Sequence, residues 1–223
     1  DDKVQSFIDF WQKLIDEDLI DTKTAGWTDE WNRGLNDGSI ASLLTGAWMP
    51  YNLLSGAPDG DGKWRIAQMP TLDGSETNSE NGGSSLAVIK TDDEAKAEAA
   101  YKFAEYACHN ADGVGVRVEG GAFPADNETL ASEDFLNMTS LTDSEGNAHE
   151  YFGGQKFNEV LAKAAANVST GYKFLPFEVN ARNVYADHAG GAFTDKSITL
   201  EEGIASWETA LKEYAEQQGY TVE

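Results

Sequence analysis

The sequence predicts an α/β fold that is rich in helices and has a small sheet. Several stretches carry apolar residues every three or four positions, which is typical of amphipathic helices. Short apolar runs bounded by Gly and Pro are typical of buried strands, and they alternate with the helical stretches along the chain. A chain of 223 residues with 40% hydrophobic residues can bury a core as one large domain or two small ones.

The first half of the chain opens with predicted helices. The apolar stripe of the first one consists of Val4, Phe7, Ile8, Trp11, Leu14, Ile15 and Leu19. A second, short helix should begin at Thr28, a residue type favoured at helix N-caps, and end near Gly38 with Trp31 and Leu35 on its apolar side. A third helix should begin near Pro50, because proline is favoured in the first helical turn.

Three apolar runs predict the strands of the sheet, at residues 40–44, 64–69 and 84–90. The first run leads into the turn Gly46–Tyr51, and Pro70 closes the second. The intervening segments, residues 55–63 and 71–83, are rich in Gly, Ser and Asp and are predicted to be loops.

The second half of the chain is predominantly helical. Thr91 and Glu94 have capping-box spacing, so an Ala-rich helix should run from there to about Asn110. Its expected core contacts are Ala95, Ala99, Phe103, Tyr106 and Ala107. Glycines interrupt residues 114–123 and leave their structure open. Helices are expected at residues 127–138, 155–168 and 181–189, a surface loop at 140–150, and a short strand or extended segment at 172–179.

The last helix should open with a second capping box, formed by Thr199 and Glu202, and end at Gly219. Its apolar stripe consists of Ile204, Trp207, Leu211 and Tyr214.

The charge balance excludes some classes of partner. The 16 Lys and Arg against 39 Asp and Glu give a formal net charge of −23. A nucleic-acid-binding face needs clustered basic residues, so we predict no nucleic-acid partner. Electrostatic docking on an anionic membrane is disfavoured for the same reason. The lone Cys108 forbids an internal disulfide and is expected to be a buried thiol in a helix rather than a nucleophile.

Catalytic and metal-binding motifs are weak. His109, His149 and His188 lie in different segments without ligand spacing, which indicates surface or capping roles. We therefore predict no catalytic residue, no metal centre and no cofactor. The stretch Asp59–Gly62 resembles the start of a calcium loop, but Lys63 and Trp64 occupy positions that need Asp or Asn and Gly. An acidic turn is the better interpretation, with weak adventitious Ca²⁺ at Asp59 and Asp61 left open.

Trp48 is the most informative aromatic residue. It follows a predicted strand and lies between Gly46 and Pro50, a turn position that favours exposure. A pyranose ring presents C–H groups that stack on indole, while its hydroxyls need polar partners. The stripes of Trp11, Trp31 and Trp207 predict core packing for those residues instead.

The order of segments resembles a known family. The segments are WTDEWNRGLNDGSIA, ASLLTGAWMPYNL, KWRIAQMPTL, NGGSSLAVIK, GGAFPADNETL and SWETALKEYAEQQG. From Val4 to Gly219 the chain resembles the C-terminal part of a bacterial extracellular solute-binding protein of the sugar-specific class, the group that includes maltose-binding protein. The resemblance implies a type II periplasmic-binding-protein-like fold. Residues 1–83 and about 126–223 would form the C-terminal lobe and about 84–125 an interlobe crossover, with the start of the N-terminal lobe absent.

The resemblance also implies a binding site and partners. Trp48 matches the family's sugar-stacking tryptophan, and the other implied cleft residues are Asn81, Gly82, Gly83, Phe123, Phe177 and Arg182. A surface salt bridge is an equally weighted alternative for Arg182. The ligand would be an oligosaccharide delivered to the permease subunits of an ABC importer. The protein would be exported and peripheral to the membrane through an N-terminal lipoprotein anchor outside these residues.

Two further expectations follow. Because half of the cleft would be absent, this portion should bind sugar weakly or not at all. The alternative function is a secreted glycan-active enzyme or a lectin-like carbohydrate-binding module that uses the same aromatic residues.

Overall fold

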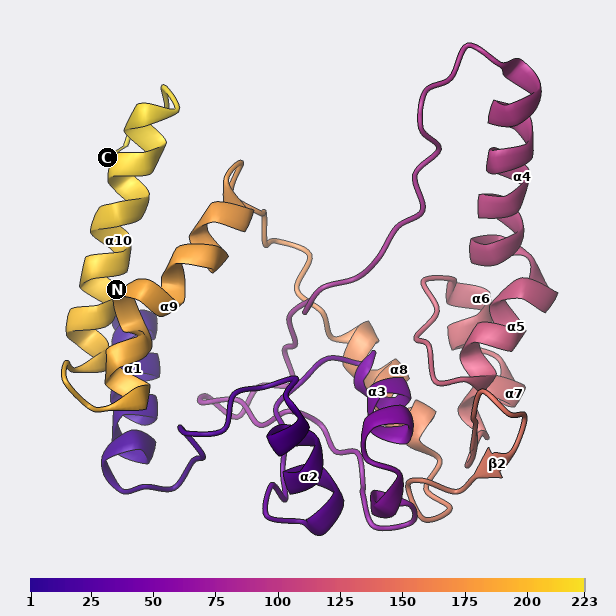
Figure 1. Ribbon diagram of the computed structural model, residues 1–223, viewed down its shortest axis with the longest axis horizontal. Helices are drawn as coiled ribbons and strands as arrows, with labels where there is room; N and C mark the ends of the chain where they lie inside the picture. Colours follow the sequence, from indigo (N-terminus) through magenta and orange to yellow (C-terminus); the bar gives the residue numbers. More distant parts are fainter. Residues whose placement is uncertain (223) are drawn as a thin grey trace. The chain divides into compact units, whose positions relative to one another are not determined.

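The computed structural model describes residues 1–222 and divides the chain into two compact units (Figure 1). The first unit combines Asp1–Thr28 with the chain from Thr170 onward, and the second is Asp29–Ser169.

The first unit is built from helices α1 (Asp2–Asp16), α9 (Glu178–Thr194) and α10 (Leu200–Gln217). The start of α10 confirms the predicted capping box. The Glu202 amide donates to the Thr199 hydroxyl at 3.1 Å, and the Thr199 amide donates to the Glu202 carboxylate at 2.8 Å. Both contacts satisfy backbone N–H groups that have no partner within the helix.

Small residues let α9 and α10 approach closely. A Cβ atom at Gly203 of α10 would lie 2.8 Å from the Ala189 Cα atom of α9. The Trp207 indole then donates to the Ala181 carbonyl at 2.8 Å and packs edge-on against Tyr185 at a centroid distance of 5.3 Å. The predicted core packing of Trp207 is confirmed.

Helix α1 packs on this pair through one part of its predicted stripe. Ile8 forms a small core with Ala192 and Leu200, and the half-buried Trp11 packs against it. Ile15 of the stripe is also fully buried, whereas Val4, Phe7 and Leu19 are exposed.

The second unit contains the remaining elements. Its helices are α2 (Asp29–Asp37), α3 (Met49–Gly56), η1 (Pro58–Gly60), α4 (Glu94–His109), α5 (Ala111–Glu119), α6 (Asn127–Leu130), α7 (Glu133–Leu136) and α8 (Phe157–Ala166). Strands β1 (Leu141–Thr142) and β2 (Ala148–His149) form an antiparallel hairpin in which Leu141 faces His149. The predicted loop at 140–150 is therefore a short hairpin.

The main core of this unit lies between α2, α3 and α8. Its buried residues are Leu35, Met49, Leu53, Leu54, Ala57, Leu141, Tyr151, Phe152, Phe157 and Leu161. Trp31 packs against it, as predicted. A second cluster joins α5 and α7 through Val114, Val118 and Phe135.

The three predicted strands at 40–44, 64–69 and 84–90 are wrong, because none of these runs pairs in a ladder among the described residues. Residues 40–44 reach the main core through the half-buried Ile40 and Leu43. Residues 64–69 are extended, and side chains take the place of a neighbouring strand. In residues 84–90 the apolar side chains point to solvent, since Ile89 is 85% exposed.

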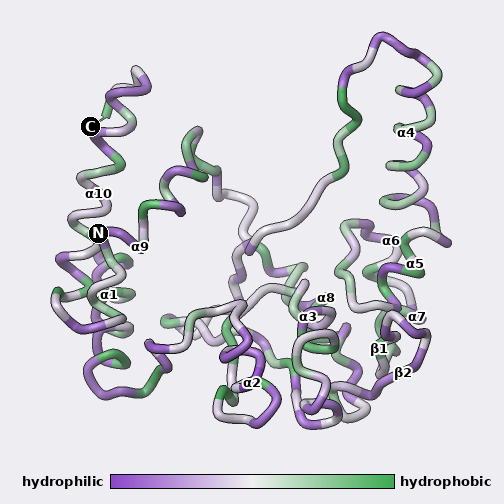
Figure 2. The backbone as a smooth tube through the Cα atoms, viewed as in Figure 1, coloured by the Kyte–Doolittle hydropathy of each residue, from purple (hydrophilic) through white to green (hydrophobic). Residues whose placement is uncertain are grey.

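Helix α4 is correctly predicted as a helix, but its expected core contacts are wrong. Its N-cap is Asp93, whose carboxylate accepts from the Lys96 amide, rather than Thr91. No residue of α4 is buried, and Phe103 is 66% exposed. Figure 2 shows a hydrophobic run in the extended chain that leads to α4. Cys108 is exposed rather than buried, like most of this helix.

Other boundaries differ in smaller ways. The open stretch at 114–123 contains α5, and the predicted helix at 127–138 divides into α6 and α7, which begin at their own caps. The predicted helix at 181–189 extends over all of α9, and residues 172–179 contain no strand. Within residues 1–222, no helix combines the length and hydropathy needed to span a bilayer.

Candidate functional site

Trp48 occupies the N-cap position of α3, and the helix predicted to begin near Pro50 begins at Met49. The side chain is half-buried and packs against the main core of the second unit. Its Nε1–H donates to the Asn81 carbonyl at 2.9 Å. The ring is thus held at the start of a core helix while part of it remains accessible to solvent.

Asn81 and Gly82 lie beside Trp48 although they are 33 and 34 positions further along the chain. A Cβ atom at Gly82 would lie 3.7 Å from the Trp48 Nε1 atom. Gly82 and Gly83 have φ angles of +86° and +121°, which residues with side chains rarely adopt. The structure therefore brings Trp48, Asn81 and Gly82 together, and Gly83 belongs to the same turn.

Phe123 lies in a loop that approaches the first turn of α3. Gly121 (φ +92°) makes this possible, because a Cβ atom there would lie 3.0 Å from the Tyr51 amide nitrogen. Phe123 itself is half-buried, packs against both cores of the unit and contacts Phe135 at a centroid distance of 6.1 Å. Its visible role is packing that fixes this loop.

Phe177 and Arg182 belong to the first unit. Phe177 is half-buried and contacts the rings of Tyr214 and Tyr220 at centroid distances of 5.6 and 5.8 Å. The exposed Arg182 pairs with Glu178 one turn earlier in α9, with an Nε–Oε1 distance of 3.2 Å. This contact is the surface salt bridge that the sequence left open as the alternative for Arg182.

Sequence reasoning missed the importance of Gly46. A Cβ atom at this position would lie 2.5 Å from the Trp48 Nε1 atom and 3.2 Å from the Asn81 carbonyl oxygen. The signal was a glycine two residues before the tryptophan, which alone does not reveal a contact with residue 81.

His149 bridges two carboxylates in the second unit. Its Nδ1 lies 3.0 Å from an Asp61 oxygen and its Nε2 lies 3.0 Å from an Asp143 oxygen. Hydrogen bonds to Asp143 and Asp61 raise the pKa of His149 above its ordinary 6.5. The contacts with His149 and Asn147 lower the pKa of Asp143 far below 3.8. The cluster joins the 58–63 loop to the β1–β2 hairpin.

The described residues contain no group of three or more His, Cys, Asp or Glu side chains arranged to hold a metal ion. Asp61 is engaged by His149, and the Asp59 amide donates to the Asn36 side chain at 2.8 Å.

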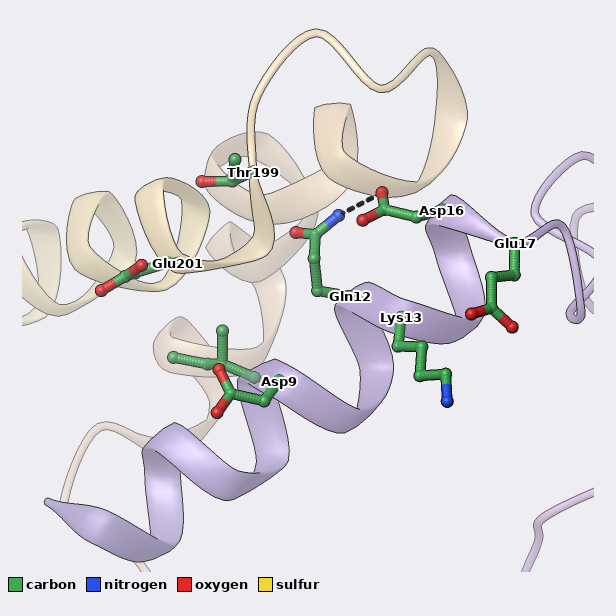
Figure 3. A pocket seen from close by; sticks show the side chains of 8 residues that line it. Asp9, Gln12, Lys13, Asp16, Glu17, Thr199 and Glu201 are labelled. Carbon is green, nitrogen blue, oxygen red and sulfur yellow. Dashed lines mark hydrogen bonds between the residues drawn. The ribbon is translucent and has the colours of Figure 1, made fainter.

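A shallow acidic groove lies in the first unit between α1 and the start of α10 (Figure 3). Its lining includes Asp9, Asp16 and Glu201, and Gln12 donates to Asp16 one turn later in α1 at 2.8 Å. Gln12 also accepts from the Leu200 amide at 2.7 Å. The contact with Leu200 joins α1 to α10, and none of the predicted binding residues lines the groove.

Comparison with known proteins supports the resemblance inferred from the segment order. No family model matches the chain, and no curated protein matches it. Among solved structures, the chain is similar to the ABC transporter associated binding protein from B. animalis subsp. lactis Bl-04 in complex with beta-1,6-galactobiose. The two are 53% identical with a TM-score of 0.90. The similarity covers 99% of this chain and 53% of the other, so this chain spans about half the length of that protein.

Proposed function

We propose that this chain is part of a solute-binding protein that captures a short oligosaccharide for an ABC-type importer. The observation that carries the proposal is the similarity over 99% of the chain, at 53% identity, to a transporter-associated binding protein complexed with a galactobiose. The half-buried Trp48 at the start of α3 supports it from the residues themselves.

The site has the chemistry that a sugar requires. An indole face supplies apolar contact for the C–H groups of a pyranose, and exposed backbone near Asn81–Gly83 can hydrogen-bond its hydroxyls. We propose Trp48 as the stacking residue, with Asn81, Gly82, Gly83, Phe123, Phe177 and Arg182 as further cleft residues. Arg182 contacts Glu178 through Nε, and the other N–H donors of its exposed guanidinium are the groups that would bind a hydroxyl.

The proposal also includes the location of the protein, its partners and its division into lobes. The protein would be exported, act at the cell surface or in a periplasm, and present its loaded form to permease subunits. It would stay near the membrane through a lipid anchor outside these residues. The lobe assignment, with residues 1–83 and about 126–223 in one lobe and about 84–125 crossing over, is also part of the proposal.

Calorimetry with a panel of disaccharides tests this function. We expect β-1,6-galactobiose to bind, weakly to this chain and more tightly to the complete gene product. Trp48→Leu should weaken binding about tenfold, as loss of one aromatic contact predicts. Phe103→Leu in α4 is the control, since it also replaces an aromatic residue and its side chain is 66% exposed.

Three results would contradict the proposal or a part of it. If neither the chain nor the complete gene product bound any sugar in the panel, the function would be wrong. Sustained release of reducing sugar from an oligosaccharide would instead favour the glycan-active enzyme. Tight binding by this chain alone would contradict the lobe assignment.

A further inference from the structure

We propose that Gly46 and the Asn81 carbonyl hold the Trp48 indole in one orientation, so that the ring can offer a ligand its face but not its N–H group. Gly46 is then a positioning residue for the binding site. The inference rests on the proposed function for its ligand, and on the contacts among these three residues for its geometry.

The Trp48 indole can donate one hydrogen bond, and this donor is already used. Tryptophan has a single side-chain donor, Nε1–H, and no side-chain acceptor. In this structure that donor points to the Asn81 carbonyl at 2.9 Å. Trp48 therefore recognises a ligand by stacking alone. The favoured ligand is a pyranose with a continuous patch of C–H groups on one face, and its hydroxyls must find partners elsewhere.

The space beside the indole is too small for a side chain at residue 46. At residue 46 a Cβ atom would lie 2.5 Å from Nε1, 2.9 Å from Cδ1 of Trp48 and 3.2 Å from the Asn81 oxygen. All three distances are shorter than ordinary carbon contacts, and two of the atoms belong to the hydrogen bond itself. Any side chain at this position forces the edge of the ring away from Asn81.

The acceptor, the Asn81 carbonyl, lies close to a part of the backbone that is fixed by hydrogen bonds. Asn78 forms an isolated parallel bridge with Val168 just after α8. The Asn78 amide donates to the Asn167 carbonyl at 2.9 Å, and the Ser169 amide donates to the Asn78 carbonyl at 2.9 Å. The acceptor thus lies three residues from a fixed point at the end of a core helix, and the turn at Gly82 and Gly83 follows at once.

Nitrogen-15 NMR of this chain tests the orientation directly. Trp48→Phe identifies the Trp48 indole signal by its loss. We expect the Trp48 indole proton of the wild-type chain to exchange with solvent at least about tenfold more slowly than a free indole proton, as one maintained hydrogen bond predicts. Gly46→Ala should abolish that protection and shift the signal. Gly115→Ala in α5 is the matched control, because a Cβ atom there meets nothing within 4 Å.

A titration with sugar distinguishes the positioning role of Gly46 from the proposed sugar-binding function. The same indole signal is followed during titration with β-1,6-galactobiose, and Gly46→Ala should weaken binding about tenfold while Gly115→Ala leaves it unchanged. Unchanged affinity in a folded Gly46→Ala variant would overturn the positioning role. An unprotected indole proton in the wild-type chain would overturn the orientation even if Gly46→Ala failed to fold. If no sugar shifts the wild-type signal in this chain or in the complete gene product, the proposed function fails, and the exchange rates still decide the orientation.

Discussion

The side-chain amide of Gln155 pairs with the backbone of Ile66 as a neighbouring strand would. The Ile66 amide donates to Gln155 Oε1 at 2.9 Å, and Gln155 Nε2 donates to the Ile66 carbonyl at 2.7 Å. Two residues further on, the Gln68 side chain donates to the Val160 carbonyl at 2.6 Å. The extended segment 64–69 is thus satisfied by side chains and by α8 rather than by a sheet.

Replacing Gln155 tests this pairing. Gln155→Leu keeps the size of the side chain but leaves both Ile66 groups without their protein partners, so we expect a loss of about 1–3 kcal/mol in the free energy of unfolding. Urea denaturation followed by circular dichroism measures it. Gln217→Leu, at an exposed position in α10, is the control and should change stability by less than about 0.5 kcal/mol. Equal effects of the two variants would show that the pairing contributes nothing.

The same relationship explains which parts of the fold could be predicted from the sequence. The capping box of Thr199 and Glu202 depends on residues three positions apart, so the sequence contains all of it. A strand needs a second strand to pair with, and the apolar run at 64–69 does not reveal whether one lies beside it. Here Gln155, 89 positions away from Ile66, takes that role. The apolar pattern of α4 likewise predicts a helix but not what would cover it.

The candidate site could likewise be predicted from the sequence only in part. Glycine and proline around Trp48 predict a turn, and the structure has one at the start of α3. The acceptor for the indole is a backbone carbonyl, and any residue type could supply it, so the sequence does not reveal the contact with Asn81. The binding role of these residues stays a prediction.

The contacts of His149 predict a pH dependence of stability. Its pKa is raised in the folded chain, so the stabilisation is complete below the ordinary 6.5 and is lost as pH rises through the folded pKa. The pKa of Asp143 is lowered, so its contribution is present above 3.8 and is lost as pH falls through the folded pKa. Stability from this cluster should be greatest between about pH 4 and 6.5.

Melting temperatures measured across pH 3–9 check this prediction. His149→Gln should reduce the fall in melting temperature on the alkaline side of that window, because Gln does not titrate. His188→Gln is the control, since that ring contacts the hydroxyl of Ser206 at 2.8 Å. An unchanged alkaline slope in His149→Gln would show that the two aspartates do not stabilise its charged form.

Replacing the buried Tyr151 tests a hydrogen bond in the main core of the second unit. Its side chain is 0% exposed, and its hydroxyl donates to the Ala57 carbonyl at 2.6 Å, just after α3 ends. Tyr151→Phe removes this bond and leaves the Ala57 carbonyl with the Gly60 amide as its partner at 3.0 Å, so we expect a loss of about 1 kcal/mol by urea denaturation. Tyr51→Phe, at a side chain that is 57% exposed, should be nearly neutral. Similar losses at both positions would argue against this hydrogen bond.

The contact between α9 and α10 predicts opposite effects for two glycine substitutions. Gly203→Ala would place a Cβ atom 2.8 Å from the Ala189 Cα atom and 3.2 Å from the His188 carbonyl oxygen. Both are backbone atoms, so the helices must separate, and we expect a loss of about 1–3 kcal/mol in the free energy of unfolding.

Gly190, one position after Ala189 in α9, is the matched control. A Cβ atom there meets nothing within 4 Å, so Gly190→Ala should gain up to about 1 kcal/mol from its higher helix propensity. Thermal denaturation of the two variants therefore separates close packing from helix propensity. If Gly203→Ala also raised the melting temperature, the two helices would have to lie further apart in solution than these distances require.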